Sequence, residues 1–225
     1  MNTPHTFQGQ ERPRERLLQH GPKVLTTPEL LAVVLGTGAP GRDAVQFSAE
    51  LLEQFSGLRN LLAADYSDLR RFKGMGNAKI CQLQAINELA GRSIEEELRQ
   101  SDTLNNSQLV KRYCINRLGH LAVEHCIAIY LDACYRLICC TEVSRGTLSR
   151  TTVYPREVAV EALKFNAAAV LLAHNHPSGS ATPSEADIAL TKHLHKSLAL
   201  IDVTLLDHIV VSQKEANSLS ELGLF

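Results

Sequence analysis

The hydrophobic pattern of this 225-residue chain changes its period near the middle, and this change limits the folds that the chain can adopt. Before residue 100, apolar side chains recur at the three- and four-residue spacing of amphipathic helices. After residue 107, short apolar and β-branched runs alternate with helical segments, as in a domain built around a sheet. The polar, turn-prone stretch 100–107 separates the two halves. We therefore expect two domains, a small all-helical one at residues 1–100 and an α/β (α+β) one at residues 101–225.

Individual elements can be placed within each half. In the first half, Pro28 opens a helix with Thr27 as its expected N-cap, and the helix ends in the glycine-rich stretch 36–41. Two more helices are expected, one at about 43–55 and a longer one after Gly76. The second half is expected to contain helices at 155–165 and 184–198, and strands at 126–131, 137–143, 169–173, 201–206 and 209–211.

The composition is that of an ordinary globular protein, with 44% hydrophobic and 21% charged residues. The formal net charge of −1 indicates no basic field, so binding to nucleic acid would need a local patch. The polar start 1–18 lacks the apolar core of a secretory signal, and the longest apolar run, 167–173, is too short to span a membrane. The six cysteines show no C-x-x-C spacing, which indicates reduced thiols. We expect a cytoplasmic protein that does not bind membranes.

The stretch 174–187 carries the most chemical information. Side chains alternate in an extended segment, so His174 and His176 are expected to project to the same side. Two imidazoles placed in this way can bind one zinc ion at about 2.0–2.1 Å from each nitrogen. Pro177 ends the strand, and Asp187 falls in the first turn of the next helix, where the helix dipole favours its ionised, metal-binding form. Three protein ligands leave the fourth tetrahedral position for water, as a catalytic zinc site requires.

Each part of this pattern also has a structural explanation. An isolated H-x-H is often incidental, and Ser184 with Asp187 has the spacing of a helix capping box, which needs no metal. An incidental H-x-H does not explain the capping box, and a capping box does not explain the H-x-H. Neither explains why the two patterns lie one loop apart after a buried strand. The complete pattern therefore favours metal binding by His174, His176 and Asp187.

The same residues resemble a known family. The H-x-H-x7-S-x-x-D pattern looks like the JAMM motif of MPN+ metallopeptidase domains, and the flanking sequence resembles the bacterial RadC branch of that family. The resemblance covers nearly the whole chain through the segments 14–18, 28–31, 155–157, 174–179 and 207–208. It implies an MPN/cytidine-deaminase-like mixed sheet flanked by helices, a zinc cofactor, and cleavage of an amide or isopeptide bond by a zinc-activated water.

The resemblance also implies a general base for that water. The family has a glutamate at the start of an early strand, a position that Glu124 matches best and Glu142 second best. Ser184 would offer its hydroxyl to the developing oxyanion. Asn175 departs from the eukaryotic deubiquitinases, which have serine or threonine between the histidines, and this departure argues against ubiquitin-like substrates. The pair 207–208, at an expected junction between two strands, could orient a ligand, but such a pair more often forms a turn and is left outside the site.

Residues 69–79 resemble a helix-hairpin-helix. Gly74 and Gly76 permit a tight turn that exposes backbone N–H groups and a helix N-terminus to a phosphate. A glycine-containing turn between helices is a weak motif, so DNA binding through residues 70–79 competes with a structural hairpin or a protein contact. Four cations lie near the turn: Arg70, Arg71, Lys73 and Lys79.

These observations lead to three hypotheses of function. The first is a zinc-dependent hydrolase, a metallopeptidase of the JAMM type that acts on a peptide or amide substrate. The alternative is a DNA-associated repair or recombination factor that binds through the N-terminal hairpin and uses the zinc domain for recruitment. The third, a non-catalytic zinc scaffold, is disfavoured because a scaffold needs neither an open metal position nor the candidate residues Ser184 and Glu124.

Overall fold

The computed structural model of the chain describes residues 11–103, 105–146 and 153–225. The chain divides into two compact units, Met1–Glu88 and Leu89–Phe225, which we call unit 1 and unit 2. Residues 1–10, 104 and 147–152 lie outside the described part, and they include most of the polar start noted in the sequence.

Unit 1 consists of short helices, as the periodicity of the first half predicts. Its helices enclose a core of buried side chains that includes Phe47, Leu51 and Leu69. Its elements are α1 (Pro13–His20), the 3-10 turn η1 (Pro22–Val24), α2 (Thr27–Leu35), α3 (Ala44–Gln54), α4 (Leu58–Ala63), α5 (Tyr66–Arg71) and the first part of α6 (Asn77–Gln100).

The start of α2 differs by one residue from the prediction. Thr26, rather than Thr27, is the N-cap, and the carboxylate of Glu29 accepts hydrogen bonds from the backbone N–H and the hydroxyl of Thr26, both at 2.8 Å. A capping box needs the cap three residues before the glutamate, a spacing that Thr26 has and Thr27 lacks. The helix ends at Gly36, whose φ of 74° suits glycine, as the predicted stop requires.

Helix α6 contains the division between the two units, which falls between Glu88 and Leu89. The last turns of α6 contribute Leu98 to a core of unit 2, so packing assigns them to that unit. Packing therefore divides the chain earlier than the change of composition at residue 100, on which the predicted domain ranges rest.

Unit 2 is an α/β domain around one mixed sheet, as predicted. The strand order is β2-β1-β3-β4-β5, with β3 and β4 parallel and the other neighbours antiparallel. The sequence pattern predicts all of these elements except α7 and the short β5. They are α7 (Ser107–Leu118), β1 (His125–Leu131), β2 (Leu137–Arg145), α8 (Pro155–Lys164), β3 (Ala169–Asn175), α9 (Glu185–Ala199), β4 (Thr204–Val211) and β5 (Ala216–Ser218).

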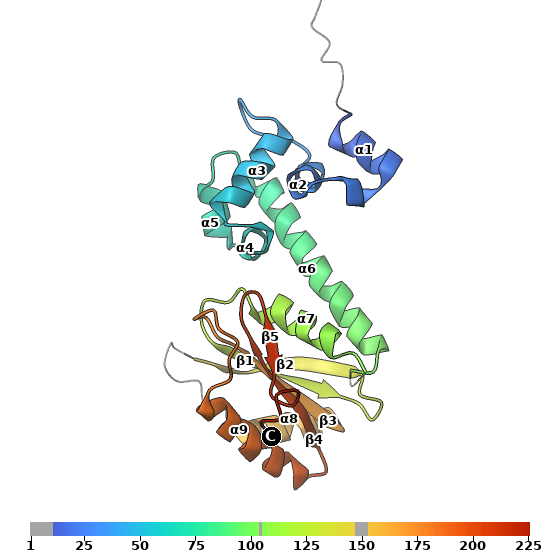
Figure 1. Cartoon of the computed structure of the whole chain (residues 1–225), viewed down its shortest axis with the longest axis vertical. Helices are drawn as coiled ribbons and strands as arrows, with labels where there is room; N and C mark the ends of the chain where they lie inside the picture. The colour runs from blue at the N-terminus through green and yellow to red at the C-terminus, as the bar shows by residue number, and fades with distance from the viewer. Residues whose placement is uncertain (1–10, 104, 147–152) are drawn as a thin grey trace, which may run out of the picture. The chain divides into compact units, whose positions relative to one another are not determined.

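The two faces of the sheet form separate cores. One face packs against α7, which contributes Tyr113 and Leu118, and the other packs against α8 and α9, which contribute Val158 and Leu194. Figure 1 shows α7 and α9 on opposite sides of the sheet. Every residue of β1 and β3 is buried, which explains why each strand contains a continuous apolar run, 126–131 in β1 and 169–173 in β3.

The last two predicted strands, 201–206 and 209–211, are a single strand in the structure. Strand β4 runs without interruption over Thr204–Val211 and pairs in parallel with β3. A register shift leaves Leu206 as an extra residue, a β-bulge. The polar pair 207–208 has the composition of a turn, but the bulge lets both residues stay inside the sheet, so the predicted junction is wrong.

Two further expectations concern the environment of the protein. No helix among the described residues is long and apolar enough to cross a membrane. The six cysteines form no disulfide. Cys114 and Cys126 are buried, whereas Cys81 and Cys134 are exposed.

Candidate metal centre

Strand β3 positions the two histidines of the candidate site. His174 lies within the buried strand and pairs with Cys126 of β1. His176 follows the strand and continues the pairing with β4, since its backbone N–H donates to the carbonyl of Val211 at 2.8 Å. The extended backbone therefore directs both imidazoles to the same side, as predicted, and their Nε2 atoms lie 2.9 Å apart.

Helix α9 positions the third residue. Asp187 lies in its first turn, with Oδ1 at 3.2 Å from Nε2 of His174 and Oδ2 at 3.5 Å from Nε2 of His176. The candidate ligand atoms of these residues all lie within 4.8 Å of one another. Within the described part of the chain, this is the one such group that could hold a metal ion.

Asp187 caps the helix and joins the cluster at the same time. Its Oδ2 accepts hydrogen bonds from the backbone N–H and the hydroxyl of Ser184, both at 2.7 Å, and Oγ of Ser184 accepts the N–H of Asp187 at 3.2 Å. This is the capping box that the sequence offered as an alternative to metal binding. Because Oδ1 lies toward His174, the cap leaves one carboxylate oxygen for a cation, and the two explanations are compatible.

The other ring nitrogens of the two histidines have partners in the protein. Nδ1 of His174 lies 2.8 Å from Nε2 of His208, and Nδ1 of His176 lies 3.0 Å from the carbonyl oxygen of Ser180. A carbonyl only accepts, so Nδ1 of His176 carries the hydrogen and Nε2 keeps a lone pair. Two imidazole nitrogens and one carboxylate oxygen are a donor set that zinc takes with one position open. The residues present therefore fit a zinc ion.

The electrostatics of the cluster favour a positive charge within it. Burial raises the pKa of Asp187, but the hydrogen bonds that Nε2 of His174 and His176 donate when their rings are protonated outweigh burial and hold that pKa well below its usual range. The hydrogen bond with Asp187 is also the main cause that raises the pKa of His176. The carboxylate thus stays ionised and attracts a cation, whether a proton or a metal ion.

His208 contacts the cluster although the sequence analysis leaves it outside the site. It pairs with Leu172 of β3, so its side chain faces the same side of the sheet as His174. Its Nδ1 lies 2.6 Å from the hydroxyl of Thr191, which donates to the carbonyl of Asp187 at 2.6 Å. Both side chains are fully buried, and burial lowers the pKa of His208 well below its ordinary value, so the imidazole is neutral. In the sequence, the polar pair Asp207 and His208 between two apolar segments was the only trace of this residue's place in the strand.

Glu124 lies just before β1, on the side of the sheet that carries the histidines. Alternation along β1 gives it the same side as Cys126, which pairs with His174. Burial raises the pKa of Cys126, and the negative charges of Glu124 and Asp187 raise it further. The charge of Glu124 also adds, after the larger effect of Asp187, to the raised pKa of His176. Both effects place the charge of Glu124 near Cys126 and His176.

Glu142, the second candidate for the base, faces away from the cluster. Its partner in β1 is Ile127, whose side chain belongs to the core on the α7 face. Its carboxylate contacts Nδ1 of His125 at 2.6 Å. The register of the sheet therefore favours Glu124 over Glu142.

Asn175, between the two histidines, holds the segment that carries Glu124. Its buried side chain accepts a hydrogen bond from the N–H of His125 at 2.8 Å. It also donates to the carbonyls of Leu121 and Val123 at 3.1 and 2.9 Å. These three bonds anchor the backbone on both sides of Glu124. The residue that departs from the deubiquitinase pattern thus has a structural purpose at the site.

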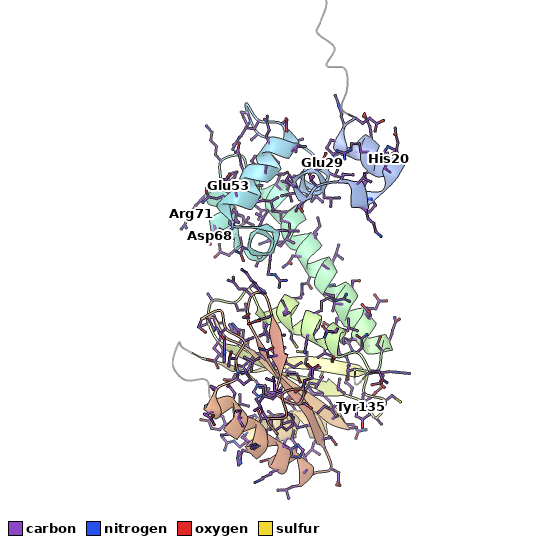
Figure 2. The ribbon with its side chains drawn as sticks, viewed as in Figure 1. His20, Glu29, Glu53, Asp68, Arg71 and Tyr135 are labelled. Carbon is purple, nitrogen blue, oxygen red and sulfur yellow. The ribbon has the colours of Figure 1, made fainter. Side chains whose placement is uncertain are left out.

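The hairpin of unit 1 is present, but most of its cations have partners within the unit. Arg70 and Lys79 donate to backbone carbonyls at 2.8 and 2.6 Å. Arg71 forms an ion pair with Asp68 at 3.0 Å, and Figure 2 labels both residues on α5. The side chain of Lys73 is exposed. Three of the four cations noted in the sequence therefore have partners within unit 1.

A mixed sheet flanked by helices, with a His-His-Asp cluster formed where β3 ends and α9 begins, defines a domain of the JAB/MPN type. Residues 104–224 match the family model described as RadC-like JAB domain. Residues 5–81 match the model described as UPF0758 N-terminal. These matches, together with UPF0758 relatives about 50% identical over nearly the whole chain, show that the chain belongs to the UPF0758 family.

The chain is similar to UPF0758 proteins along almost its whole length. One from Bordetella bronchiseptica is 50% identical over 223 residues, which are 99% of both chains. One from Bordetella parapertussis is 52% identical over 211 residues, 94% of both chains. One from Janthinobacterium sp. (strain Marseille) is 49% identical over 214 residues, 95% of this chain and 96% of the relative. These names state a family and no activity.

Proposed function

We propose that this protein is a zinc-dependent hydrolase that cleaves an amide or isopeptide bond. The proposal rests on the convergence of ligand atoms from His174, His176 and Asp187 within 4.8 Å. Structural zinc sites are usually closed by four protein ligands, whereas three ligands leave one position open. An open position suits a hydrolase and has no use in a scaffold.

Zinc at these three residues would supply a Lewis acid and lower the pKa of water at the open position. The remaining steps belong to the protein. Glu124, held on the cluster side by Asn175, would accept a proton from that water and deliver it to the leaving amine. A carboxylate in this role needs hydrogen-bond reach to the water without binding the metal, and its place at the start of β1 suits this requirement.

Ser184 would support the reaction only through a small movement. In this structure its hydroxyl donates to Asp187 at 2.7 Å. To stabilise a developing oxyanion, the hydroxyl would turn from Asp187 toward the substrate, a contact worth about 3–4 kcal/mol in comparable sites. The backbone N–H of Ser184 would keep its own bond to Asp187 at 2.7 Å, so the cap would survive.

A substrate screen with the full-length, zinc-loaded protein tests the proposal. Peptides, isopeptides and small amides are offered to the wild type, to Glu124→Gln and to Glu142→Gln. We expect turnover that needs zinc, disappears in Glu124→Gln with zinc content unchanged, and persists in Glu142→Gln. Activity that survives in a His174→Ala/His176→Ala double variant, or equal zinc content in that variant and the wild type, would refute the proposal.

DNA binding through residues 70–79, the alternative function, stays a prediction and gains no specific support from the hairpin. Arg70, Arg71 and Lys73 are all exposed, but the first two have partners within the unit, so Lys73 offers the sharpest test. Binding of the full-length protein to duplex DNA is measured over a range of salt concentrations, for the wild type and for Lys73→Ala. If the hairpin binds phosphates, the negative slope of log K against log salt should become shallower by about 1 in the variant. A slope that does not change would remove Lys73 from any DNA contact.

A further inference from the structure

The hydrogen bonds that link Thr191, His208 and His174 have a defined direction. The hydroxyl of Thr191 donates its single hydrogen to the carbonyl of Asp187 at 2.6 Å. Toward His208 the same oxygen therefore only accepts. Nδ1 of His208, at 2.6 Å from that oxygen, must carry the hydrogen of this contact.

This direction determines the tautomer of His174. His208 is fully buried, and among the described residues its ring nitrogens contact only the Thr191 hydroxyl and the His174 ring, so no carboxylate offsets a charge on it. Its imidazole therefore has one N–H, on Nδ1, and its Nε2 is an acceptor. Nδ1 of His174 lies 2.8 Å from this acceptor and therefore donates. With its hydrogen on Nδ1, His174 has a lone pair on Nε2, the atom that lies 3.2 Å from Oδ1 of Asp187. That lone pair is what a metal ion would bind.

We propose that His208 and Thr191 are positioning residues for the metal centre. Three hydrogen bonds run from His174 through His208 and Thr191 to the backbone of Asp187, so the chain begins and ends on candidate ligands. It sets the tautomer of one ligand and ties β3, β4 and the first turns of α9 together. The inference rests on the proposed zinc site and concerns how tightly the protein binds the metal.

A purely structural role for the same residues is the competing explanation. Thr191 lies four residues after Asp187, and helical threonines often bond the carbonyl four residues earlier without further consequence. Both Thr191 and His208 are also fully buried and fill space in the core. Packing alone does not require the contact of 2.6 Å between Thr191 and His208, nor the further contact of His208 with His174.

The test uses two substitutions at Thr191 in the full-length protein. Thr191→Val keeps the shape and removes the hydroxyl, whereas Thr191→Ser keeps the hydroxyl. Zinc affinity is measured by competition with a chelator, and stability is measured separately on the zinc-free protein. We expect Thr191→Val to bind zinc about 10- to 100-fold more weakly, the usual loss when a partner of a ligand is removed, and Thr191→Ser to stay close to the wild type. His193→Gln, an exposed histidine on the same helix, is the matched control and should change nothing.

Substitutions at His208 and a second metal give independent readouts. His208→Gln keeps an oxygen that can accept a hydrogen bond from His174, whereas His208→Leu has no acceptor. Zinc should therefore bind more tightly to His208→Gln than to His208→Leu. With cobalt in place of zinc, the visible absorption spectrum should change in Thr191→Val and not in Thr191→Ser, because only the first releases the orientation of His174.

The outcomes separate this inference from the proposed function. Wild-type protein that binds no zinc would overturn the proposed function and the inference with it. Tight zinc binding by the wild type and equally tight binding by Thr191→Val would overturn the inference alone. Equal losses of affinity in Thr191→Val and Thr191→Ser, or a loss of zinc-free stability with unchanged affinity, would also overturn it, since packing would then explain the effect.

Discussion

Asp187→Asn separates the two tasks of one carboxylate. In the structure Oδ2 accepts two hydrogen bonds from Ser184 and caps α9, while Oδ1 faces His174 at 3.2 Å. An asparagine keeps one acceptor oxygen and loses the charge. The substitution should therefore weaken the cap modestly in every condition and weaken metal binding strongly when zinc is present.

The two losses can be estimated separately. Losing part of a capping box costs about 1 kcal/mol of unfolding free energy. Zinc at about 1,000 times its Kd adds ~4.1 kcal/mol of stability. A charged ligand should matter at least as much as an orienting partner, so we take a ~100-fold loss of affinity. Zinc would then add only ~1.4 kcal/mol to the variant. The gap between wild type and Asp187→Asn should be about 1 kcal/mol in chelator and about 4 kcal/mol in zinc.

The assay is urea unfolding of both full-length proteins at a fixed free zinc concentration and in chelator. Glu185→Gln is the matched control, because Glu185 is an exposed carboxylate in the same helical turn and lies outside the cluster. It removes the same charge from the helix N-terminus, and its small effect should not depend on zinc. A gap for Asp187→Asn that is the same with and without zinc would refute the reasoning and remove Asp187 from the ligand set.

Three further predictions follow. In chelator, NMR titration should give His176 a pKa above its ordinary value, and Asp187→Asn should lower that pKa. Because the pKa in the folded protein lies above the unfolded value of about 6.5, the contact between His176 and Asp187 stabilises the metal-free protein below a pH of about 6.5. Its contribution is lost as the pH rises through the folded pKa. Lys79→Met should destabilise unit 1 by about 1–2 kcal/mol in thermal unfolding, because Lys79 donates to a backbone carbonyl and lies 4.3 Å from an aromatic ring centroid, while Lys73→Met should be neutral. Asn175→Ala should cost about 2–4 kcal/mol in urea unfolding of the zinc-free protein, since three backbone groups lose their partner, and a loss below about 0.5 kcal/mol would contradict that reading.

The elements that the sequence predicts well are those set by local geometry. Side chains alternate in any extended backbone, so the H-x-H spacing alone places His174 and His176 on one side of a strand. The spacing of Ser184 and Asp187 likewise specifies a capping box, because both bonds form within one helical turn. The helical and the α/β half of the chain and the His-His-Asp cluster could therefore be predicted from local patterns, whereas the mixed character of the sheet came from the family resemblance.

The prediction at residues 201–211 failed because a β-bulge has no characteristic amino-acid composition that would reveal it in the sequence. Asp207 and His208 have polar side chains that are typical of a turn, but the structure places them within β4. Asp207 accepts hydrogen bonds from Ser218 and Ser220, and His208 bonds Thr191. These partners come from distant parts of the chain, so no local pattern could indicate that the two residues lie inside a sheet.

The preference for Glu124 over Glu142 stays a prediction, and it also rests on tertiary structure. The pairing of β1 with β2 has a register shift between Tyr130 and Leu131, which comes before Glu142 in β2 and sets Glu142 opposite Ile127. Without that shift, Glu142 would pair with Cys126, on the side of the sheet that carries the histidines. One extra residue in a strand reverses the side to which every later side chain points. The sequence by itself determined which residues can bind a metal, because that depends on local alternation. Only the folded sheet decided which other side chains lie on the same side as these metal-binding candidates, because that depends on the register of the strands.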